Sequence, residues 1–225
     1  MEILQTIWNV LISENERLAN ILICPFIFIE AYLYMLIFTT LLKIKTNSNQ
    51  KIAYTVTFAL IAIINILFIP YPYYTFVNVL ACPILVFMIF KQDILTSILC
   101  EIISYFVLFL LITPLIIIYT NITGLSSTLV TSIPLHRVIY SLLFYVLIYI
   151  FCKFCIKFKI HISVLRKLKN KYSSSLITNF IIGTIAIAIQ CYLEFIYIDY
   201  LPKYLVFMSI SVLVIYFFIS LFSLA

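Results

Sequence analysis

Residues 94–119 read ILTSILCEIISYFVLFLLITPLIIIY, an apolar run that contains a single carboxylate, Glu101, and a single proline, Pro114. A helix of roughly 20 apolar residues is long enough to cross the hydrocarbon core of a bilayer. This run is longer, so it predicts a membrane span that tilts or bends, and Pro114 supplies a local cause for a bend. We therefore expect membrane helices to set the fold.

Similar apolar runs fill most of the chain. Of its 225 residues 65% are hydrophobic and only 10% are charged, and the mean hydropathy is +1.22, which indicates an integral membrane protein. Long continuous runs favour helices over a β-barrel, whose strands alternate. The fold class is therefore predicted as an all-α polytopic membrane helix bundle of about seven spans, at 18–42, 52–69, 74–90, 94–119, 138–158, 176–198 and 204–224. The run 74–90 is short, and six spans result if it is re-entrant.

The first seventeen residues differ from the rest. Apolar residues recur at helical spacing on one face, which predicts an amphipathic interfacial segment over 1–17 anchored by Trp8. Ser13 and Glu16 have the spacing of a capping box that would open the first span. Residues 18–225 then form one transmembrane domain, and no soluble domain is predicted.

The basic residues predict the orientation. Only Arg17, Arg137 and Lys203 fall on one side of the predicted bundle, and the other side carries eleven: Lys43, Lys45, Lys51, Lys91, Lys153, Lys157, Lys159, Arg166, Lys167, Lys169 and Lys171. The positive-inside rule then places the N-terminus outside and the C-terminus inside. This rule also accounts for the net charge of +6, so we expect no nucleic-acid partner.

The residues that usually carry catalysis or bind cofactors are sparse. His136 and His161 fall on opposite sides of the predicted membrane and cannot share a metal or a catalytic pair. A cysteine peptidase pair of Cys155 and His161 lacks an orienting carboxylate or amide nearby. The chain has two glycines, so it offers no phosphate-binding loop, and this scarcity also argues against a transporter. We expect no catalytic residue, no metal and no cofactor.

Three carboxylates lie inside predicted spans: Glu30, Glu101 and Glu194. Ionisable groups at this depth are costly and face protein or water. Each has polar neighbours one turn away, Tyr34 beside Glu30, Ser97, Ser104 and Tyr105 beside Glu101, and Gln190 and Tyr197 beside Glu194. Two interpretations stay open: neutral carboxyls that hydrogen-bond between helices, or a polar pocket, for which Glu194 is the best placed.

Aromatic residues gather on the predicted outer side. PYPYYTF (70–76) joins the second and third spans, and YIDYLPKY (197–204) joins the sixth and seventh. These tyrosines fit an interfacial belt, or an aromatic mouth for a hydrophobic peptide that the loop 121–137 would cover. The candidate ligand-binding residues are Tyr71, Tyr73, Tyr74, Glu194, Tyr197, Asp199 and Tyr200.

Four phrases carry a resemblance to a known family: IPYPYYTFVNVLACPILVFMIFK (69–91), TSIPLHRVIYSLLFYV (131–146), IYIDYLP (196–202) and IYFFISLFSLA (215–225). With its order of apolar elements, the chain resembles the N-terminal sensor region of Agr-type quorum-sensing histidine kinases of Gram-positive bacteria. The resemblance implies a sensor in the cell membrane that perceives an extracellular signal, often a cyclic peptide. It also implies partners: a cytoplasmic kinase domain of the GHKL type, with a homodimer as an open alternative.

The chain departs from that family because it lacks the phosphoacceptor histidine motif, the asparagine-rich nucleotide box and the glycine-rich lid. No catalytic residue is carried over, and the chain is not expected to be an enzyme. Because YFFISLFSLA (216–225) ends on an apolar run, we expect a sensor module whose kinase domain is missing. The rival functions are a membrane substrate-binding or transport subunit and, with less support, an integral membrane peptidase.

The distribution of basic residues gives a topology that reporter fusions can test. Fusions after Thr46, Gln92 and Lys169 should report the cytoplasm, and fusions after Tyr73, Ser126 and Asp199 should report the outside. A cytoplasmic signal at Ser126 would reverse the orientation.

Overall fold

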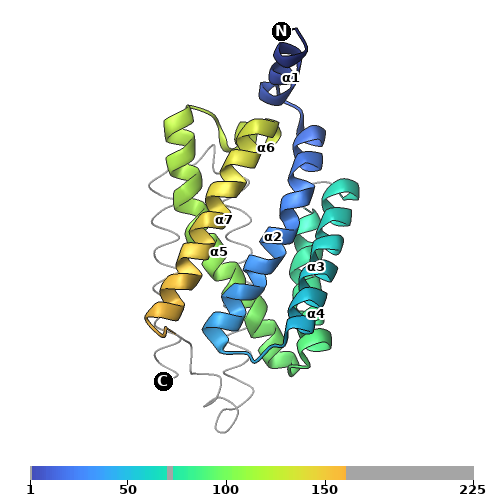
Figure 1. Ribbon diagram of the computed structural model, residues 1–225, viewed down its shortest axis with the longest axis vertical. Coiled ribbons are helices and arrows are strands. Elements are labelled where there is room, and N and C mark those ends of the chain that lie inside the picture. The colour runs from blue at the N-terminus through green and yellow to red at the C-terminus, as the bar shows by residue number, and fades with distance from the viewer. Residues whose placement is uncertain (1, 70–72, 161–225) are drawn as a thin grey trace. The chain divides into compact units, whose positions relative to one another are not determined.

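The computed structural model describes residues 2–69 and 73–160, and every regular element in these residues is a helix (Figure 1). The elements are α1 (Glu2–Ile12), α2 (Glu16–Leu42), α3 (Ser48–Phe68), α4 (Tyr73–Phe90), α5 (Ile94–Thr123), α6 (Ser127–Ser132) and α7 (Pro134–Lys157). The all-α prediction is thus confirmed for the described residues. The predicted spans 176–198 and 204–224 lie outside them.

Five predicted spans correspond to α2, α3, α4, α5 and α7. Four of these helices are long and apolar enough to cross a membrane: α2, α3, residues Thr96–Thr123 of α5, and α7. The fifth, Val77–Phe90 within α4, is a shorter apolar helix, as the run 74–90 suggested. At about 1.5 Å per residue, α5 is longer than the hydrocarbon core is thick, and it continues through Pro114.

Helix α2 is the central element of this part of the chain. It packs against α3, α5 and α7, and the sequence neighbours α3 with α4 and α4 with α5 also pack together. Figure 1 shows consecutive long helices running in opposite directions, with α5 oblique to α3 and α4. One end of the bundle therefore carries the C-terminal ends of α2, α4 and α7.

The core between α2, α3 and α4 is aromatic. Phe38 meets Tyr54 edge-on, with ring centroids 5.5 Å apart, and meets Phe90 at 5.8 Å. Tyr54 stacks on Phe58 at 5.7 Å, and Phe58 stacks on Tyr34 at 5.5 Å. All five side chains are buried, so this cluster fixes the packing of three helices.

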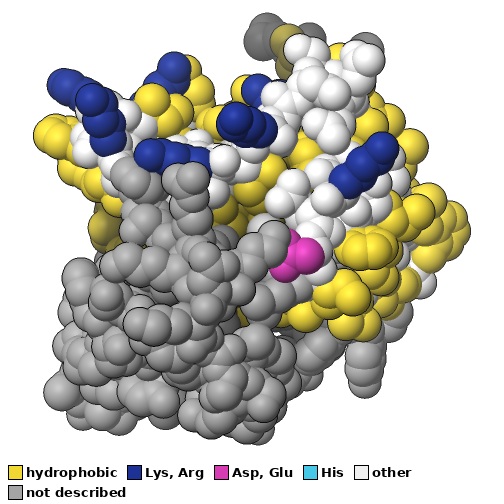
Figure 2. Space-filling view, turned by 90° about the horizontal axis from the view of Figure 1, so that it is seen from below, with side chains coloured by type: hydrophobic (Ala, Val, Ile, Leu, Met, Phe, Trp, Pro, Cys, Tyr) yellow, Lys and Arg dark blue, Asp and Glu magenta, His cyan; other side chains and the backbone are white. Residues whose placement is uncertain are grey.

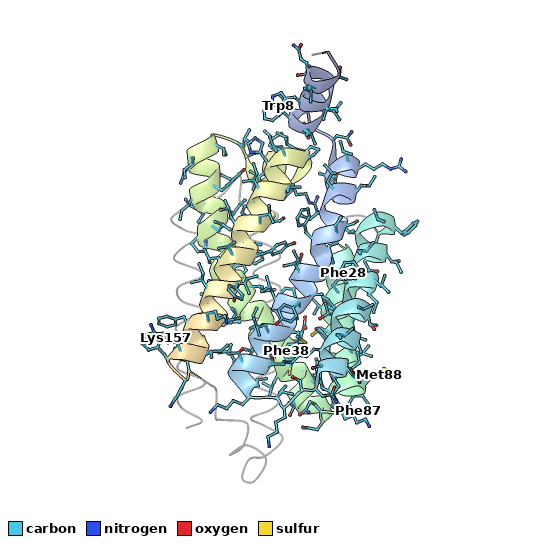
Figure 3. The ribbon with its side chains drawn as sticks, in the orientation of Figure 1. Trp8, Phe28, Phe38, Phe87, Met88 and Lys157 are labelled. Carbon is cyan, nitrogen blue, oxygen red and sulfur yellow. The ribbon has the colours of Figure 1, made fainter. Side chains whose placement is uncertain are left out.

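Many exposed side chains of the bundle are apolar as well. Phe28, Phe87 and Met88 are exposed on the bundle, whereas Phe38 is fully buried (Figure 3). An apolar exterior is expected of helices that cross a membrane, because their outer side chains contact lipid and not water.

The seven described lysines gather at one end. They lie in or next to the terminal turns of helices, at the end that carries the C-termini of α2, α4 and α7 (Figure 2). The described arginines, Arg17 and Arg137, lie at the other end. We call these the lysine end and the arginine end. Three lysines, Lys43, Lys91 and Lys159, have positive φ angles of 52°, 52° and 54° just after a helix. Glycine usually fills such positions, and lysine there adds a charge that favours a helix C-terminus.

Helix α1 lies where the sequence predicted a short helix near the N-terminus. Its side chains from Leu4 to Val10 are exposed, Leu4 at 74% and Trp8 at 54%. It contacts α7 at the arginine end, and Trp8 is labelled there in Figure 3. An exposed apolar surface on a short helix fits the predicted interfacial segment.

The capping box predicted at Ser13 and Glu16 is wrong. Helix α2 begins at Glu16, and its N-cap is Asn15, whose side chain accepts a 3.0 Å hydrogen bond from the Leu18 amide. The Ser13 hydroxyl instead donates to the Val10 carbonyl at 3.0 Å, at the end of α1. The reason is tertiary: the Asn15 amide donates to the Ser132 carbonyl at 2.9 Å, which fixes where the chain turns into α2.

The predicted covering loop at 121–137 is largely helical. Gly124, with a φ of 70°, ends α5, and Ser126 caps α6 through a 3.2 Å hydrogen bond from the Leu129 amide. Helix α6 packs against α7 and α2, and its Ser127 and Val130 are buried. We call α6 the helical cap. It is a packed element of the arginine end and not a loose cover.

The N-cap assignment gives a stability prediction. Asn15→Ala removes the only side-chain acceptor for the Leu18 amide and should lower the free energy of unfolding by about 1 kcal/mol. Ser13→Ala is the matched control and should change it by less. Denaturant titration in mixed micelles measures both. If Ser13→Ala lowered the free energy of unfolding more than Asn15→Ala does, the capping box at Ser13 would be supported instead.

Candidate functional site

Several polar side chains inside the described bundle bond across helices. Three such hydrogen bonds join α3 to α4, α5 to α7 and α2 to α7: Asn65 Nδ2 to Asn78 Oδ1 at 2.7 Å, Tyr119 Oη with His136 Nδ1 at 2.9 Å, and Tyr145 Oη to Glu30 Oε2 at 3.0 Å. Sequence reasoning named only Glu30 among these as an intramembrane polar residue. Asn65 and Asn78 carried the same signal, a polar residue inside an apolar run, and were missed.

Glu30 forms a hydrogen bond between two helices, as one of the two interpretations expected, but its partner is Tyr145 and not Tyr34. Tyr145 on α7 donates to Glu30, and Ser141, one turn earlier on α7, also acts on the Tyr145 hydroxyl. The positive charge of Arg137 also acts on Glu30. Tyr34, the neighbour expected from sequence, does not bond to Glu30. Because α2 packs against α3 on one side and α7 on another, residues one turn apart meet different helices.

Glu101 lies in a second polar cluster, formed with Tyr34, Cys82 and Ser104; we call it the Glu101 cluster. Glu101 is 6% exposed, Tyr34 5%, and Cys82 and Ser104 are fully buried. Tyr34 on α2 and Cys82 on α4 are the side chains that act on the Glu101 carboxyl. Ser104 is one turn along α5 from Glu101 and so shares its face.

The Glu101 cluster differs from the Glu30 tie in how its polar atoms are satisfied. Among the described residues, both carboxyl oxygens of Glu101, Tyr34 Oη and Ser104 Oγ are buried without a hydrogen-bond partner. Cys82 is engaged, since the Tyr54 hydroxyl donates to its Sγ at 3.3 Å. Buried polar atoms in native proteins are almost always bonded, and those that are not point to water, an ion or a functional role.

Local sequence explains how the cluster forms. On α2, Ile27, Ala31, Tyr34 and Phe38 recur at helical spacing and are all in the core, so Tyr34 is carried inward with them. On α5, Ser97 lies four residues before Glu101, and its hydroxyl is satisfied by the Asp93 carbonyl at 3.0 Å.

Most of the predicted ligand-binding residues fall outside the described part of the chain. Tyr73 and Tyr74 are the first residues of α4, and their side chains are not described. The others, with the intramembrane Gln190, lie outside the described residues: Tyr71, Gln190, Glu194, Tyr197, Asp199 and Tyr200. The aromatic mouth therefore stays a prediction.

Cysteines and histidines form no metal centre in the described residues. Cys24, Cys82, Cys100, Cys152 and Cys155 are free thiols, and within this part of the chain no three His, Cys, Asp or Glu side chains are grouped to hold a metal. His136 is bonded to Tyr119 at the arginine end, and Cys155 is buried near the far end of α7. His161, the other half of the peptidase pair considered above, lies outside the described residues.

The helices and their exposed side chains indicate the class of protein. The described helices form an all-helical bundle with an apolar exterior, and they suit a multi-pass membrane protein. Comparison of the chain with family models, with curated proteins and with solved structures found no match. The class therefore rests on the helices and their side chains.

A double-mutant cycle tests the Glu30 tie. Glu30→Gln and Tyr145→Phe should each destabilise the bundle, and the pair should couple by about 0.6–1.7 kcal/mol because they share one interhelical hydrogen bond.

Tyr140→Phe is the control for the cycle, since its hydroxyl donates to the Ile112 carbonyl at 3.4 Å and not to Glu30. Glu30→Gln and Tyr140→Phe should add without coupling in the same unfolding measurements. Equal coupling for both tyrosines would show that Glu30 acts through the packing of α7 in general.

Proposed function

We propose that the chain is the receptor-like input module of a bacterial cell-membrane sensor. Outside the cell it would perceive a hydrophobic signal, most suitably a cyclic peptide. A helix shift would then reach a cytoplasmic GHKL kinase or another signalling partner. The proposal takes its ligand class from the resemblance of residues 69–91 and 131–146 to Agr-type sensor regions.

The path of α7 is the observation that supports this proposal most directly. It starts beside the helical cap and α1 at the arginine end and finishes at Lys157 on the lysine end (Figure 3). It is joined to α5 by Tyr119 and His136 and to α2 by Glu30 and Tyr145. A ligand that repacks the cap would therefore bias a helix that reaches the opposite end, as a two-state sensor requires.

The predicted orientation in the membrane adds where the signal would bind. If the lysine end is cytoplasmic, the helical cap and the start of α4 face outward, where a peptide arrives. The tyrosines after residue 70 would offer the peptide a large aromatic surface, and Glu194 or Asp199 would hold its polar edge.

The alternative of a substrate-binding or transport subunit is favoured by a different observation, the buried polar atoms of the Glu101 cluster. Intramembrane polar groups often mark solute or ion pathways. The transport alternative would be supported if proteoliposomes that contain the chain took up a polar solute that the chain binds. Binding of hydrophobic peptides without uptake would support the sensor.

The test of the proposed sensor combines binding with a distance. The purified chain would be exposed to a panel of short hydrophobic cyclic peptides, with linear peptides of the same composition as control. Spin labels on cysteines at positions 43 and 157, with the native cysteines replaced, report the spacing of α2 and α7 at the lysine end. A cyclic peptide should bind saturably and change this distance, because the signal is passed on as a helix shift.

Variants localise the response. Tyr73→Ala or Glu194→Gln should weaken the binding of an active peptide, and Lys169→Gln, placed on the opposite side, should leave it intact. If every peptide leaves the distance unchanged in a folded protein, the sensor proposal is wrong.

A further inference from the structure

The two carboxyls inside the described bundle differ in their electrostatic surroundings. Glu30 has a hydrogen-bond donor, Tyr145, and a positive charge, Arg137, acting on it. The side chains that act on Glu101 are Tyr34 and Cys82, neither of which carries a positive charge at neutral pH. An isolated negative charge in the hydrocarbon region is costly, so Glu101 needs something that balances it.

The titratable groups around the Glu101 cluster come from α2, α3, α4 and α5. They are Tyr34 on α2, Tyr54 on α3, Cys82 on α4, and Cys100 and Tyr105 on α5. All are tyrosines or cysteines, so within the described residues no lysine, arginine or histidine belongs to this set. Among the residues that the structure describes, no protein cation therefore balances Glu101.

Two further oxygens of the Glu101 cluster are buried without a partner. Tyr34 Oη and Ser104 Oγ, each on a side chain more than nine-tenths buried, lack hydrogen-bond partners together with both Glu101 oxygens. A proton would neutralise Glu101, but its single O–H could donate to only one of the two hydroxyl oxygens. A cation can take up the carboxylate and hydroxyl oxygens together, and such oxygens are the ligands that hard cations prefer.

We propose that Glu101, Tyr34 and Ser104 form an intramembrane site for one alkali-metal cation of the sodium class. The carboxylate supplies the charge, and the two hydroxyl oxygens are neutral ligands from α2 and α5. A monovalent ion fits better than a divalent one, since one carboxylate balances one positive charge and a divalent ion would leave a net charge in the hydrocarbon region.

The position of Glu101 gives the ion a short route. Glu101 is seven residues from the first residue of α5, about 10 Å along the helix from the lysine end. Because Tyr34 and Glu101 lie on different helices, an ion at this site would hold α2 and α5 together. The site does not depend on which function the chain serves, so the experiment below stands whether the protein is a sensor or a transporter.

Radioactive sodium, measured by scintillation proximity on the purified full chain in choline chloride, tests the site directly. Wild type should bind saturably, near one ion per chain, and excess unlabelled sodium should displace it. Sodium should also raise the apparent melting temperature by about 2–4 °C at saturation, as a ligand of the folded state does.

Three variants separate a built site from general electrostatics. Glu101→Gln, which keeps the side-chain shape, should weaken sodium binding at least about ten-fold, and Ser104→Ala should weaken it less. Glu30→Gln removes an equally buried carboxyl that is already partnered, and it should bind sodium as wild type does. Melting curves in choline show that each variant is folded.

Two results would overturn the proposal. The first is the absence of saturable sodium binding in folded wild type, including the case in which only acidification stabilises it, because a proton then neutralises Glu101. The second is sodium binding that Glu101→Gln leaves unchanged, because the ion then binds elsewhere.

Discussion

The exclusion of water from the interior of the bundle is the constraint on which the rest of the structure depends. Backbone amides and carbonyls in such a medium must bond within their own helix, which makes the long described elements helical from cap to cap. Side chains are then the groups left to connect one helix with another. The described part of the chain does this with the aromatic cluster around Phe38 and Tyr54 and with a few polar pairs.

Two aromatic contacts and one polar pair make α2 the central helix of the described bundle. Through Phe38 and Tyr34 it joins α3 and α4, and through Glu30 it joins α7. Apolar packing alone provides little drive for helices to associate in lipid, because the lipid tails are equally apolar. Close aromatic packing and hydrogen bonds that lipid cannot replace therefore define which helices are neighbours.

The two ends of the bundle are built differently. The lysine end has helix C-termini followed by lysines, three of them in the left-handed conformation that glycine usually adopts. The arginine end has the helical cap, α1 and the turn at Asn15 and Ser132, all packed on α7. In the described residues the lysines lie at one end and the packed cap at the other. This asymmetry is one reason why we propose a sensor.

The sequence by itself determined the helical class, the five apolar runs that became α2, α3, α4, α5 and α7, and the confinement of lysines to one end. These follow from composition and spacing, because a bilayer rewards long apolar runs wherever they occur. Only the tertiary structure decided that Asn15 and not Ser13 caps α2. It also decided that Tyr34 belongs to the Glu101 cluster, and that Glu30 bonds to Tyr145 instead. In the sequence pattern, residues one turn apart share a face of their helix. When several helices pack around that helix, however, the arrangement of those helices decides which neighbour each residue contacts.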